Sequence, residues 1–316
     1  MAAVLELRNV SKFYGDFKAV NEVSLSLEAG RIYGFLGPNG AGKTTTIRMI
    51  LDIIRPTSGS ISILGAASAL QVRNHIGYLP EEKGLYKKMK AWSVIAYFAT
   101  LKGLSRKAAK LRAFELLERY GLKDFAEKKT DALSKGMGQK VQVLASIAHD
   151  PEFVILDEPF SGLDPVNQQV MEEIIREMAS RGRTVLFSTH VMQHAERLCE
   201  RIILIARGEK IFDGSIPEAK RKIPRRVAIE TVEGINLDGI ASLPEVVSVT
   251  RIPPTAAQAT SNHWEIHVRD DADSSAILRA CFERGIQLRG FHQAEPTLHD
   301  VFVRLVGPEA REAGFR

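Results

Sequence analysis

Eight residues between positions 37 and 44 have the composition and spacing of a loop that holds phosphate groups. The segment Gly37-Pro38-Asn39-Gly40-Ala41-Gly42-Lys43-Thr44 matches the pattern G-x-x-x-x-G-K-S/T at every position. Glycines let backbone N–H groups close around phosphate oxygens, Lys43 can neutralise the β- and γ-phosphates, and the Thr44 hydroxyl can coordinate Mg²⁺. A tight turn with an incidental surface lysine is the alternative. The apolar run before the loop and the helical pattern after it favour a nucleoside triphosphate site that extends to Thr45.

Two adjacent carboxylates, Asp157 and Glu158, directly follow the apolar run Phe153–Leu156. A buried strand that ends there would deliver both to the carboxyl edge of a sheet, where ligands bind in open α/β folds. Asp157 could then hold Mg²⁺, and Glu158 could take a proton from an attacking water molecule. Taken alone, Asp157 and Glu158 would be better explained as solvated acids at the end of a strand. Because the phosphate loop at 37–44 is present in the same chain, a role in metal binding and catalysis is the better explanation.

The segments that must position these residues alternate between strand and helix. Residues 4–28 have the spacing of short strands, and residues 88–150 are mostly helical in character. Further expected strands are Arg31–Leu36, Phe153–Leu156, Thr184–Ser188 and Arg201–Ala206, and expected helices include Lys43–Ile54, Ala91–Leu104, Leu133–His149, Val166–Ser180 and Val191–Glu200. This alternation predicts an α/β domain with a largely parallel sheet.

The sequence changes in character after about Pro217. The basic segment Lys220–Arg226 is typical of a linker or exposed turn. Expected strands are Val227–Thr231, Val246–Ile252, Trp264–Val268 and one near Gln287–Phe291, and expected helices are Ser274–Glu283 and Leu298–Leu305. These elements predict a small α+β appendage.

The composition excludes several classes of protein. The chain has 316 residues, of which 45% are hydrophobic and 26% charged, so two globular domains are expected and wholesale disorder, collagen and a disulfide scaffold are excluded. Its 43 Lys and Arg against 38 Asp and Glu give a net charge of +5, spread along the chain, which favours a solvated surface over a nucleic-acid or anionic-membrane surface. Cys199 and Cys281 are expected to be free thiols in a reducing compartment. No apolar stretch approaches the length of a transmembrane helix.

Further short segments occur in a fixed order around the two sites. They are Ile76-Gly77-Tyr78-Leu79-Pro80-Glu81, Leu133-Ser134-Lys135-Gly136-Met137, Ser161-Gly162-Leu163-Asp164 and Ser188-Thr189-His190. Together with the loop at 37–44, they make residues 4–217 resemble the ATP-binding subunit of an ABC transporter. The segments Gly77–Tyr86, Leu133–Gln142 and Glu295–Phe302 are similar to one branch of that family. Its ATPase carries a C-terminal appendage and works with a separate membrane protein, often in export of drugs, peptides or sodium.

The resemblance implies a P-loop NTPase fold, with a RecA-like core, an antiparallel β subdomain and a helical subdomain. The ABC ATP-binding domain would span residues 1–217 with its helical subdomain at about 88–150, followed by an α+β appendage at 218–307 and a flexible tail at 308–316. The implied activity is ATP hydrolysis, with ATP and Mg²⁺, that drives export through a separate membrane subunit. The chain would act as a homodimer on the cytoplasmic face of the cell membrane, and no nucleic-acid partner is expected.

The resemblance also assigns roles at the boundary between two copies of the chain. Ser134 and Gly136 resemble residues that touch the γ-phosphate of the ATP bound to the opposing subunit. Asp164 resembles a loop residue that links the two sites across the dimer. His190 resembles the histidine that senses the γ-phosphate. A lone histidine after a strand is more often a surface or core residue, but the place of His190 in this series of motifs reverses that preference.

An aromatic residue for the adenine base is suggested in the same way. Tyr14 resembles the aromatic that stacks on adenine, and Phe13 and Phe17 are close enough to be confused with it. Aromatic stacking is an unspecific signal, and a strand-edge aromatic without a role at adenine is the less favoured alternative for Tyr14.

Two residues depart from the family pattern. Glu81 stands where glutamine is usual, and its carboxylate could coordinate the metal and contribute to catalysis, but it adds negative charge near the phosphates. Lys135 stands where many members have glycine, so it must point away from the nucleotide or contact a phosphate.

Two rival interpretations remain open. The chain could be a soluble ABC ATPase that acts on ribosomes or DNA, although it has a single phosphate loop and no sustained heptads. The appendage could bind a regulatory ligand, although a module that stabilises the dimer is favoured.

Overall fold

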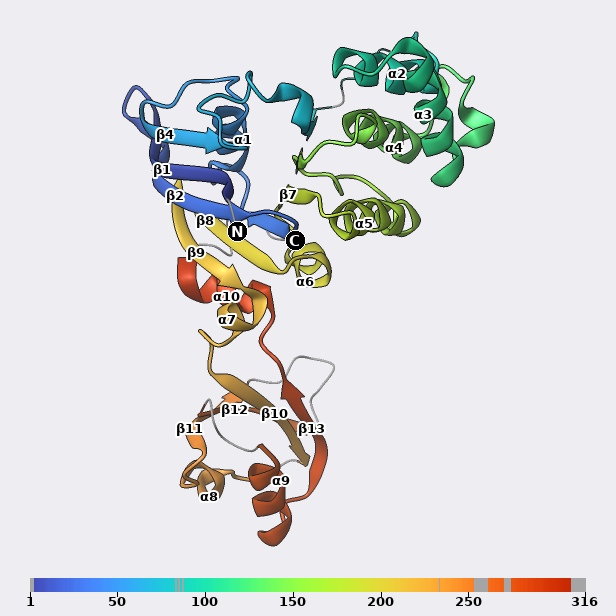
Figure 1. Ribbon diagram of the computed structural model, residues 1–316. Coiled ribbons are helices and arrows are strands. Elements are labelled where there is room, and N and C mark those ends of the chain that lie inside the picture. Colours follow the sequence, from blue (N-terminus) through green and yellow to red (C-terminus); the bar gives the residue numbers. More distant parts are fainter. Residues whose placement is uncertain are drawn as a thin grey trace. The chain divides into compact units, whose positions relative to one another are not determined.

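The computed structural model describes residues 3–82, 84, 86, 88–232, 234–252, 261–269 and 274–307. The chain forms two compact units: the N-terminal unit comprises the residues up to Ile216 together with Val306 and Gly307, and the C-terminal unit comprises Pro217–Leu305 (Figure 1). The tail expected at 308–316, and residues 83 and 85 of the segment Gly77–Tyr86, lie outside the described residues.

A six-stranded sheet forms the centre of the N-terminal unit. Its strand order is β5-β6-β7-β3-β8-β9, with bounds β3 (Ile32–Leu36), β5 (Ile76–Leu79), β6 (Phe153–Leu156), β7 (Thr184–Thr189), β8 (Arg201–Ala206) and β9 (Glu209–Ser215). All pairs are parallel except β8 with β9. Strands β3, β6 and β7 are buried along their whole length, which explains their continuous apolar runs. The predicted α/β fold with a largely parallel sheet is confirmed.

A second, antiparallel sheet covers one side of this core. It has the order β2-β1-β4, with β1 (Ala3–Tyr14), β2 (Phe17–Glu28) and β4 (Ser58–Ile63). Helix α1 (Lys43–Ile50) lies between the two sheets and buries Ile47 and Ile50 in a shared hydrophobic core. The helix expected at Lys43–Ile54 therefore ends four residues early, at a turn where Asp52 has φ +57°. Strand β4 was not predicted.

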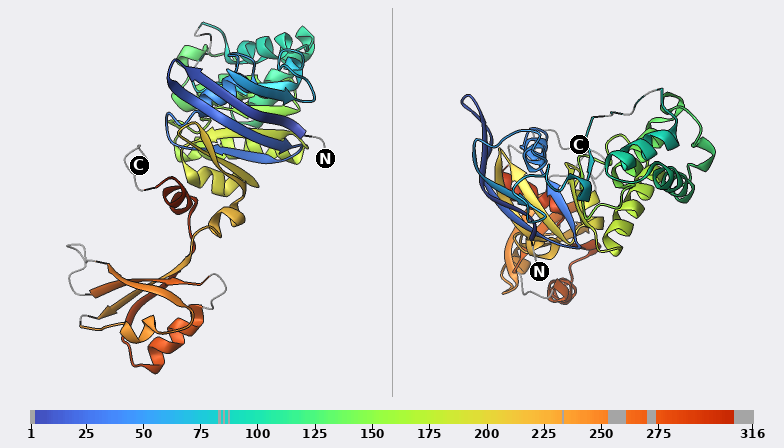
Figure 2. Two further views of the ribbon diagram at one scale, coloured as in Figure 1. Left: turned by 90° about the vertical axis from the view of Figure 1, so that its left-hand side faces the viewer. Right: turned by 45° about the horizontal axis from the view of Figure 1, so that its top comes forward.

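The remaining helices of the N-terminal unit include a separate helical subdomain. It contains α2 (Ala91–Leu101), α3 (Arg106–Arg119) and α4 (Lys135–Ile147), and lies on the other side of the six-stranded sheet from the antiparallel sheet (Figures 1 and 2). Ser105 caps α3, because its hydroxyl accepts a hydrogen bond from the N–H of Ala108. Helices α5 (Pro165–Ser180) and α6 (Met192–Leu198) pack beside the central sheet. None of the helices in the described part of the chain is long and apolar enough to cross a membrane.

The C-terminal unit is built on a four-stranded antiparallel sheet of order β11-β12-β10-β13. Its elements are α7 (Ile216–Lys220), β10 (Arg225–Val232), α8 (Asp238–Ala241), β11 (Val246–Ile252), β12 (Ser261–Val268), α9 (Ser274–Glu283), β13 (Leu288–Ala294) and α10 (Leu298–Val306). Helices α8 and α9 cover one face of the sheet and share a core with Val227, Ile229 and Ile266 (Figure 1). The small α+β domain predicted after the α/β domain is confirmed.

The segment Glu295–Phe302, singled out by its resemblance, has a structural explanation. The N–H and hydroxyl of Thr297 donate hydrogen bonds to Asp300 Oδ2 at 2.9 and 2.7 Å, so the two residues form a capping box at the start of α10. Arg226 also contacts both carboxylate oxygens of Asp300 at 3.2 Å. Burial acts to raise the pKa of Asp300, but these hydrogen bonds and the positive charge outweigh it and lower that pKa.

Candidate ATP-binding and hydrolysis site

The phosphate loop joins the end of β3 to the start of α1. Gly42 has φ +101° and precedes the first residue of the helix, and a Cβ atom on it would lie 2.5 Å from the carbonyl oxygen of Ala19. A Cβ on Gly37 would lie 2.2 Å from the carbonyl oxygen of Ile205. Glycine is therefore required at both positions, and the loop is folded against β2 and β8 with its N–H groups near the positive end of α1.

The loop residues from Pro38 to Thr45 line one wall of a cavity of about 310 Å³. Its other walls include Phe17, Glu81 and Glu158. The described structure therefore brings together, around one space, the predicted phosphate loop and two of the three predicted catalytic residues.

Lys43 is buried at the base of this cavity. Its ammonium donates hydrogen bonds to the carbonyl oxygens of Gly37 at 2.7 Å and Pro38 at 3.2 Å, and lies 3.4 Å from Glu158 Oε1. Only 6% of the residue is exposed. A cation so poorly hydrated is a strong attractor for a phosphate oxygen that enters the cavity.

Asp157 follows β6 and is completely buried. Its Oδ1 atom accepts hydrogen bonds from the Ser188 hydroxyl at 2.5 Å and the Thr44 hydroxyl at 3.4 Å. Its Oδ2 atom has no hydrogen-bond partner among the described residues, and burial raises the pKa of the carboxyl group. A buried, partly unpaired carboxylate next to a hydroxyl has the oxygen donors that Mg²⁺ prefers, so these residues fit that ion.

Glu158 has a strained backbone that aims its side chain at the cavity. Its φ is +48°, and its N–H donates a hydrogen bond to the Ser188 hydroxyl at 2.9 Å. Its Oε2 atom lies 3.0 Å from Nδ1 of His190, the residue after β7. The carboxylate thus lies between Lys43 and His190, and His190 joins the same group of residues.

Glu81 adds a third carboxylate to this edge of the sheet. It lies just after β5 on the cavity wall, and burial together with the charges of Asp157 and Glu158 raises the pKa of its carboxyl group. The described residues, these three carboxylates included, contain no cluster of three or more His, Cys, Asp or Glu that could hold a metal by themselves. This is the usual situation for Mg²⁺ bound together with substrate phosphates.

Comparison with known proteins identifies the family. The profile of the ABC transporter family matches residues 20–161, and that of the C-terminal domain of DrrA1-3-like ATP-binding proteins matches residues 214–306. The ABC transporter ATP-binding protein YhaQ of Bacillus subtilis is 37% identical over 96% of this chain and 99% of its own length. The chain belongs to the ABC transporter ATP-binding subunits. It is therefore an ABC ATPase that binds adenine nucleotides.

Other relatives of this ABC ATPase have names that refer to export and resistance. The Nod factor export ATP-binding protein I of Burkholderia orbicola is 35% identical over 98% of this chain and 99% of that protein. The linearmycin resistance ATP-binding protein LnrL of Bacillus subtilis is 32% identical over 98% of this chain and all of that protein.

Solved ABC structures share the fold of the N-terminal unit. An ATP-binding subunit of an ABC transporter has a TM-score of 0.64 and 31% identity, over 69% of this chain and 92% of that chain. A dimeric post-hydrolysis ATP-binding cassette bound to ADP and phosphate has a TM-score of 0.63 and 26% identity, over 67% of this chain and 98% of that chain.

The aromatic residue that lines the cavity of this ABC ATPase is Phe17, whereas Tyr14 was predicted to stack on adenine. Tyr14 and Phe17 are paired at the β1–β2 turn, but Phe17 lines the cavity and Tyr14 is not among its lining residues. Tyr14 is half exposed, with the ammonium of Lys12 at 5.2 Å from the centre of its ring. Its role at adenine stays a prediction.

The three residues predicted to face a second subunit do not line the cavity of their own chain. Ser134 caps α4, and its hydroxyl accepts a hydrogen bond from the N–H of Met137 at 3.3 Å. A Cβ on Gly136 would lie 2.5 Å from Asn167 Nδ2, and Asp164 caps α5 by accepting hydrogen bonds from the N–H and side chain of Asn167. These hydrogen bonds lower the pKa of Asp164. The residues therefore form one cluster at the starts of two helices.

Two residues have contacts that the sequence analysis did not anticipate. Ser188, which the sequence shows only as part of the segment Ser188-Thr189-His190, connects Asp157 to the backbone of Glu158 through its hydroxyl. Its place at the end of the strand beside β6 was the available signal. The ammonium of Lys135 lies where a Cβ on Gly162 would be, so this side chain packs over the loop that leads to Asp164.

Proposed function

We propose that this ABC ATPase binds Mg²⁺-ATP in the cavity beside the phosphate loop and hydrolyses it to drive export through a separate membrane subunit. The observation that carries the proposal is the convergence of Lys43, Thr44, Asp157, Glu158 and His190 at the carboxyl edge of one sheet. Residues 1–217 would be the ATP-binding domain and residues 218–307 the appendage.

Each residue has a role that follows from its contacts. Loop N–H groups and the Lys43 ammonium would hold the β- and γ-phosphates, and Lys43 would exchange its carbonyl partners for phosphate oxygens. Thr44 and Asp157 would hold Mg²⁺, which neutralises negative charge on the phosphates. Glu158 would take a proton from the attacking water, and His190, 3.0 Å from its carboxylate, would orient that carboxylate and contact the γ-phosphate.

A head-to-tail homodimer would complete the site. Ser134 and Gly136 lie at the start of α4, outside the cavity of their own chain, so the positive end of that helix is available to a nucleotide held by another copy. The dimeric form of the solved cassette with ADP and phosphate supports this arrangement. ATP would then hold two copies together, and loss of the products would release them.

Export through a membrane partner is supported by the relatives that match almost the whole chain. Two of them are named for Nod factor export and for linearmycin resistance. In this proposal a separate membrane subunit supplies the pathway. The chain would then be peripheral, on the cytoplasmic face of the cell membrane.

The location of the chain tests this part of the proposal. When the chain is co-expressed with its membrane subunit, we expect it to move from the soluble to the membrane fraction. Without that subunit it should stay soluble. Co-sedimentation with ribosomes, unchanged by the membrane subunit, would instead support a soluble ABC ATPase.

Replacing Glu81 with glutamine should change the dependence of hydrolysis on Mg²⁺ without abolishing turnover. The variant loses a negative charge that lies close to Asp157 and Glu158, so it should bind ATP more tightly and need about three to ten times more Mg²⁺ for half-maximal activity. Titrations of the ATPase rate with Mg²⁺ measure both effects. Glu82→Gln is the matched control, because that side chain is 89% exposed. Identical titrations for Glu81→Gln and the parent would contradict a metal role for Glu81.

A further inference from the structure

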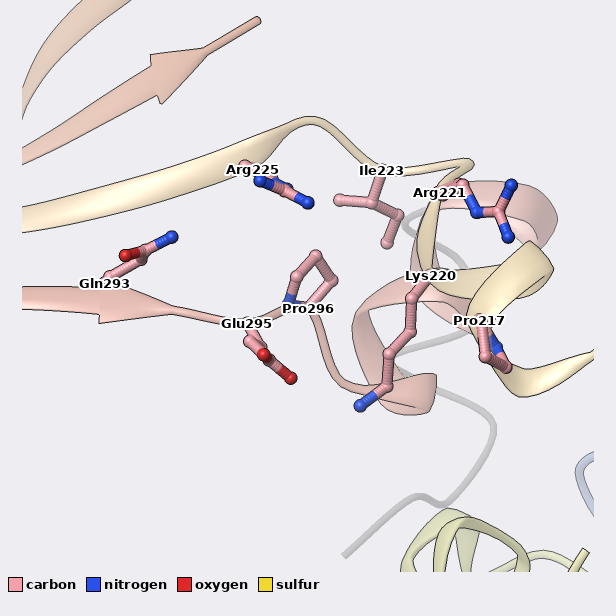
Figure 3. Close-up of a pocket in the computed structure, with 8 residues that line it drawn as sticks. All are labelled: Pro217, Lys220, Arg221, Ile223, Arg225, Gln293, Glu295 and Pro296. Atoms are coloured by element: carbon pink, nitrogen blue, oxygen red, sulfur yellow. The ribbon is translucent and has the colours of Figure 1, made fainter. Parts of the chain in front are cut away.

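A second cavity lies in the C-terminal unit, where β10 and β13 stop pairing. The two strands are hydrogen-bonded as far as the pair Arg226 and Ala294, and beyond it their backbones diverge. Pro296 has no N–H group and cannot extend the ladder. The fork encloses about 400 Å³ between residues 217–225 and 293–296 (Figure 3). That volume is within the range of small-molecule sites.

The charged groups around this fork are strongly unbalanced. Lys220, Arg221 and Arg225 line it together with a single carboxylate, that of Glu295, so the lining has three positive charges, one negative charge and a net charge of +2. Neither guanidinium, of Arg221 or of Arg225, makes a hydrogen bond or ion pair with any residue that the structure describes. The fork therefore has two arginines available for an anion.

Arg226, the next residue after Arg225, has a structural role that Arg221 and Arg225 do not share. Arg226 contacts Asp300 at 3.2 Å and Glu265 at 3.3 Å, and its charge is thereby balanced within the unit. The basic segment is thus divided, because one arginine stabilises the fold while the two nearest arginines line the fork.

The rest of the lining is mostly apolar. Pro217, Ile223 and Pro296 supply hydrocarbon surface, and Ile223 and Pro296 belong to the opposite arms of the fork (Figure 3). The amide of Gln293 can both donate and accept a hydrogen bond. Cations beside apolar walls suit a ligand that has an anionic group and an apolar body.

We propose that this fork is a binding site for a small amphiphilic anion, whose phosphate or carboxylate contacts Arg225 and, once its side chain has turned toward the fork from the orientation in Figure 3, Arg221, and whose apolar part packs on Ile223 and Pro296. The anion could be a soluble compound or the headgroup of an anionic lipid, since both present the same chemistry. The site is independent of the ATP cavity, because none of its lining residues belongs to the phosphate loop.

Calorimetric titration of the full chain with 1-naphthyl phosphate, 1-naphthol and inorganic phosphate tests the proposal. The key variant is Arg221→Ala with Arg225→Ala. The control is Lys222→Ala with Arg269→Ala, which removes two exposed positive charges from the same unit outside the fork. Any binding at the phosphate loop is common to all these proteins and cancels in the comparison.

We expect the parent and the control to bind 1-naphthyl phosphate at least about tenfold more tightly than inorganic phosphate, and the double arginine variant to lose at least about tenfold in affinity. Equal affinity of the arginine variant and the parent, or equal binding of 1-naphthol and 1-naphthyl phosphate, would overturn the proposal. Vesicles of phosphatidylcholine with and without phosphatidylglycerol distinguish an anionic lipid headgroup from a soluble anion as the ligand. Sedimentation with anionic vesicles that requires Arg221 and Arg225 assigns the site to a lipid headgroup, and arginine-dependent binding of the soluble phosphate alone assigns it to a soluble anion.

Discussion

Replacing Glu158 with glutamine is expected to lower the rate of ATP hydrolysis at least about 100-fold while the chain still binds ATP. The amide keeps the size and the hydrogen-bonding oxygen of the carboxylate, so the neighbouring Lys43 ammonium and His190 ring keep a partner. It has no basic oxygen that can take a proton from water. Steady-state hydrolysis and equilibrium binding of ATP, measured on the same preparation, separate the two effects.

The same variant should accumulate as a dimer when ATP is present. If ATP holds two copies together and hydrolysis releases them, a chain that binds without hydrolysing stays in the closed state. Size-exclusion chromatography should show a dimer with ATP and a monomer with ADP. Glu173→Gln, an exposed carboxylate on α5, is the control and should behave like the parent. An unchanged hydrolysis rate for Glu158→Gln would reject Glu158 as the base.

The central strands could be predicted almost residue by residue. Strands β6 and β8 have the expected bounds, Phe153–Leu156 and Arg201–Ala206. A parallel strand that is covered on both faces must be apolar at successive positions, so its pattern is short, continuous and bounded by polar residues. The same pattern predicted that β6 delivers Asp157 and Glu158 to the carboxyl edge of the sheet.

Edge strands were missed because little of their surface is buried. The first three residues of β4, Ser58, Gly59 and Ser60, are exposed, and the segment that leads into it has the composition of a turn. Strand β9 is the antiparallel edge of the central sheet and contains polar residues at most positions. Each strand has only two large apolar residues, Ile61 and Ile63 in β4 and Ile211 and Phe212 in β9, and both strands are held by pairing with strands that the core stabilises.

The details of the site depend on contacts between segments that are distant in sequence. The sequence indicates that Asp157 and Glu158 are adjacent, but it does not indicate the φ of +48° at Glu158 or the hydrogen bond from its N–H to Ser188, thirty residues further along the chain. Likewise, Tyr14 and Phe17 are directly opposed in the β1–β2 hairpin, and that Phe17 lines the cavity is known only once the hairpin is packed beside the phosphate loop.

Replacing Lys43 with alanine is expected to weaken the binding of Mg²⁺-ATP at least about 100-fold, because the cavity loses its buried cation. Lys43→Met keeps most of the side-chain volume without the charge, and its affinity for Mg²⁺-ATP should fall by the same factor. Lys18→Ala removes an exposed lysine from β2 and is the control. Fluorescence titration with a labelled ATP analogue measures the affinities.

The loss of the cation should also affect the fold, and this has to be separated from binding. Lys43→Ala leaves the buried Glu158 carboxylate without its positive neighbour at 3.4 Å, so the free energy of unfolding should fall by about 3 kcal/mol. The double variant Lys43→Ala with Glu158→Gln removes both charges, and it should regain most of the stability of the parent without regaining ATP affinity. Thermal unfolding and titration of the parent, single and double variants resolve the two contributions. If either variant without Lys43 bound Mg²⁺-ATP as tightly as the parent, the phosphate loop would not be the nucleotide site, because no other described cation lies within the cavity lining to take over that role.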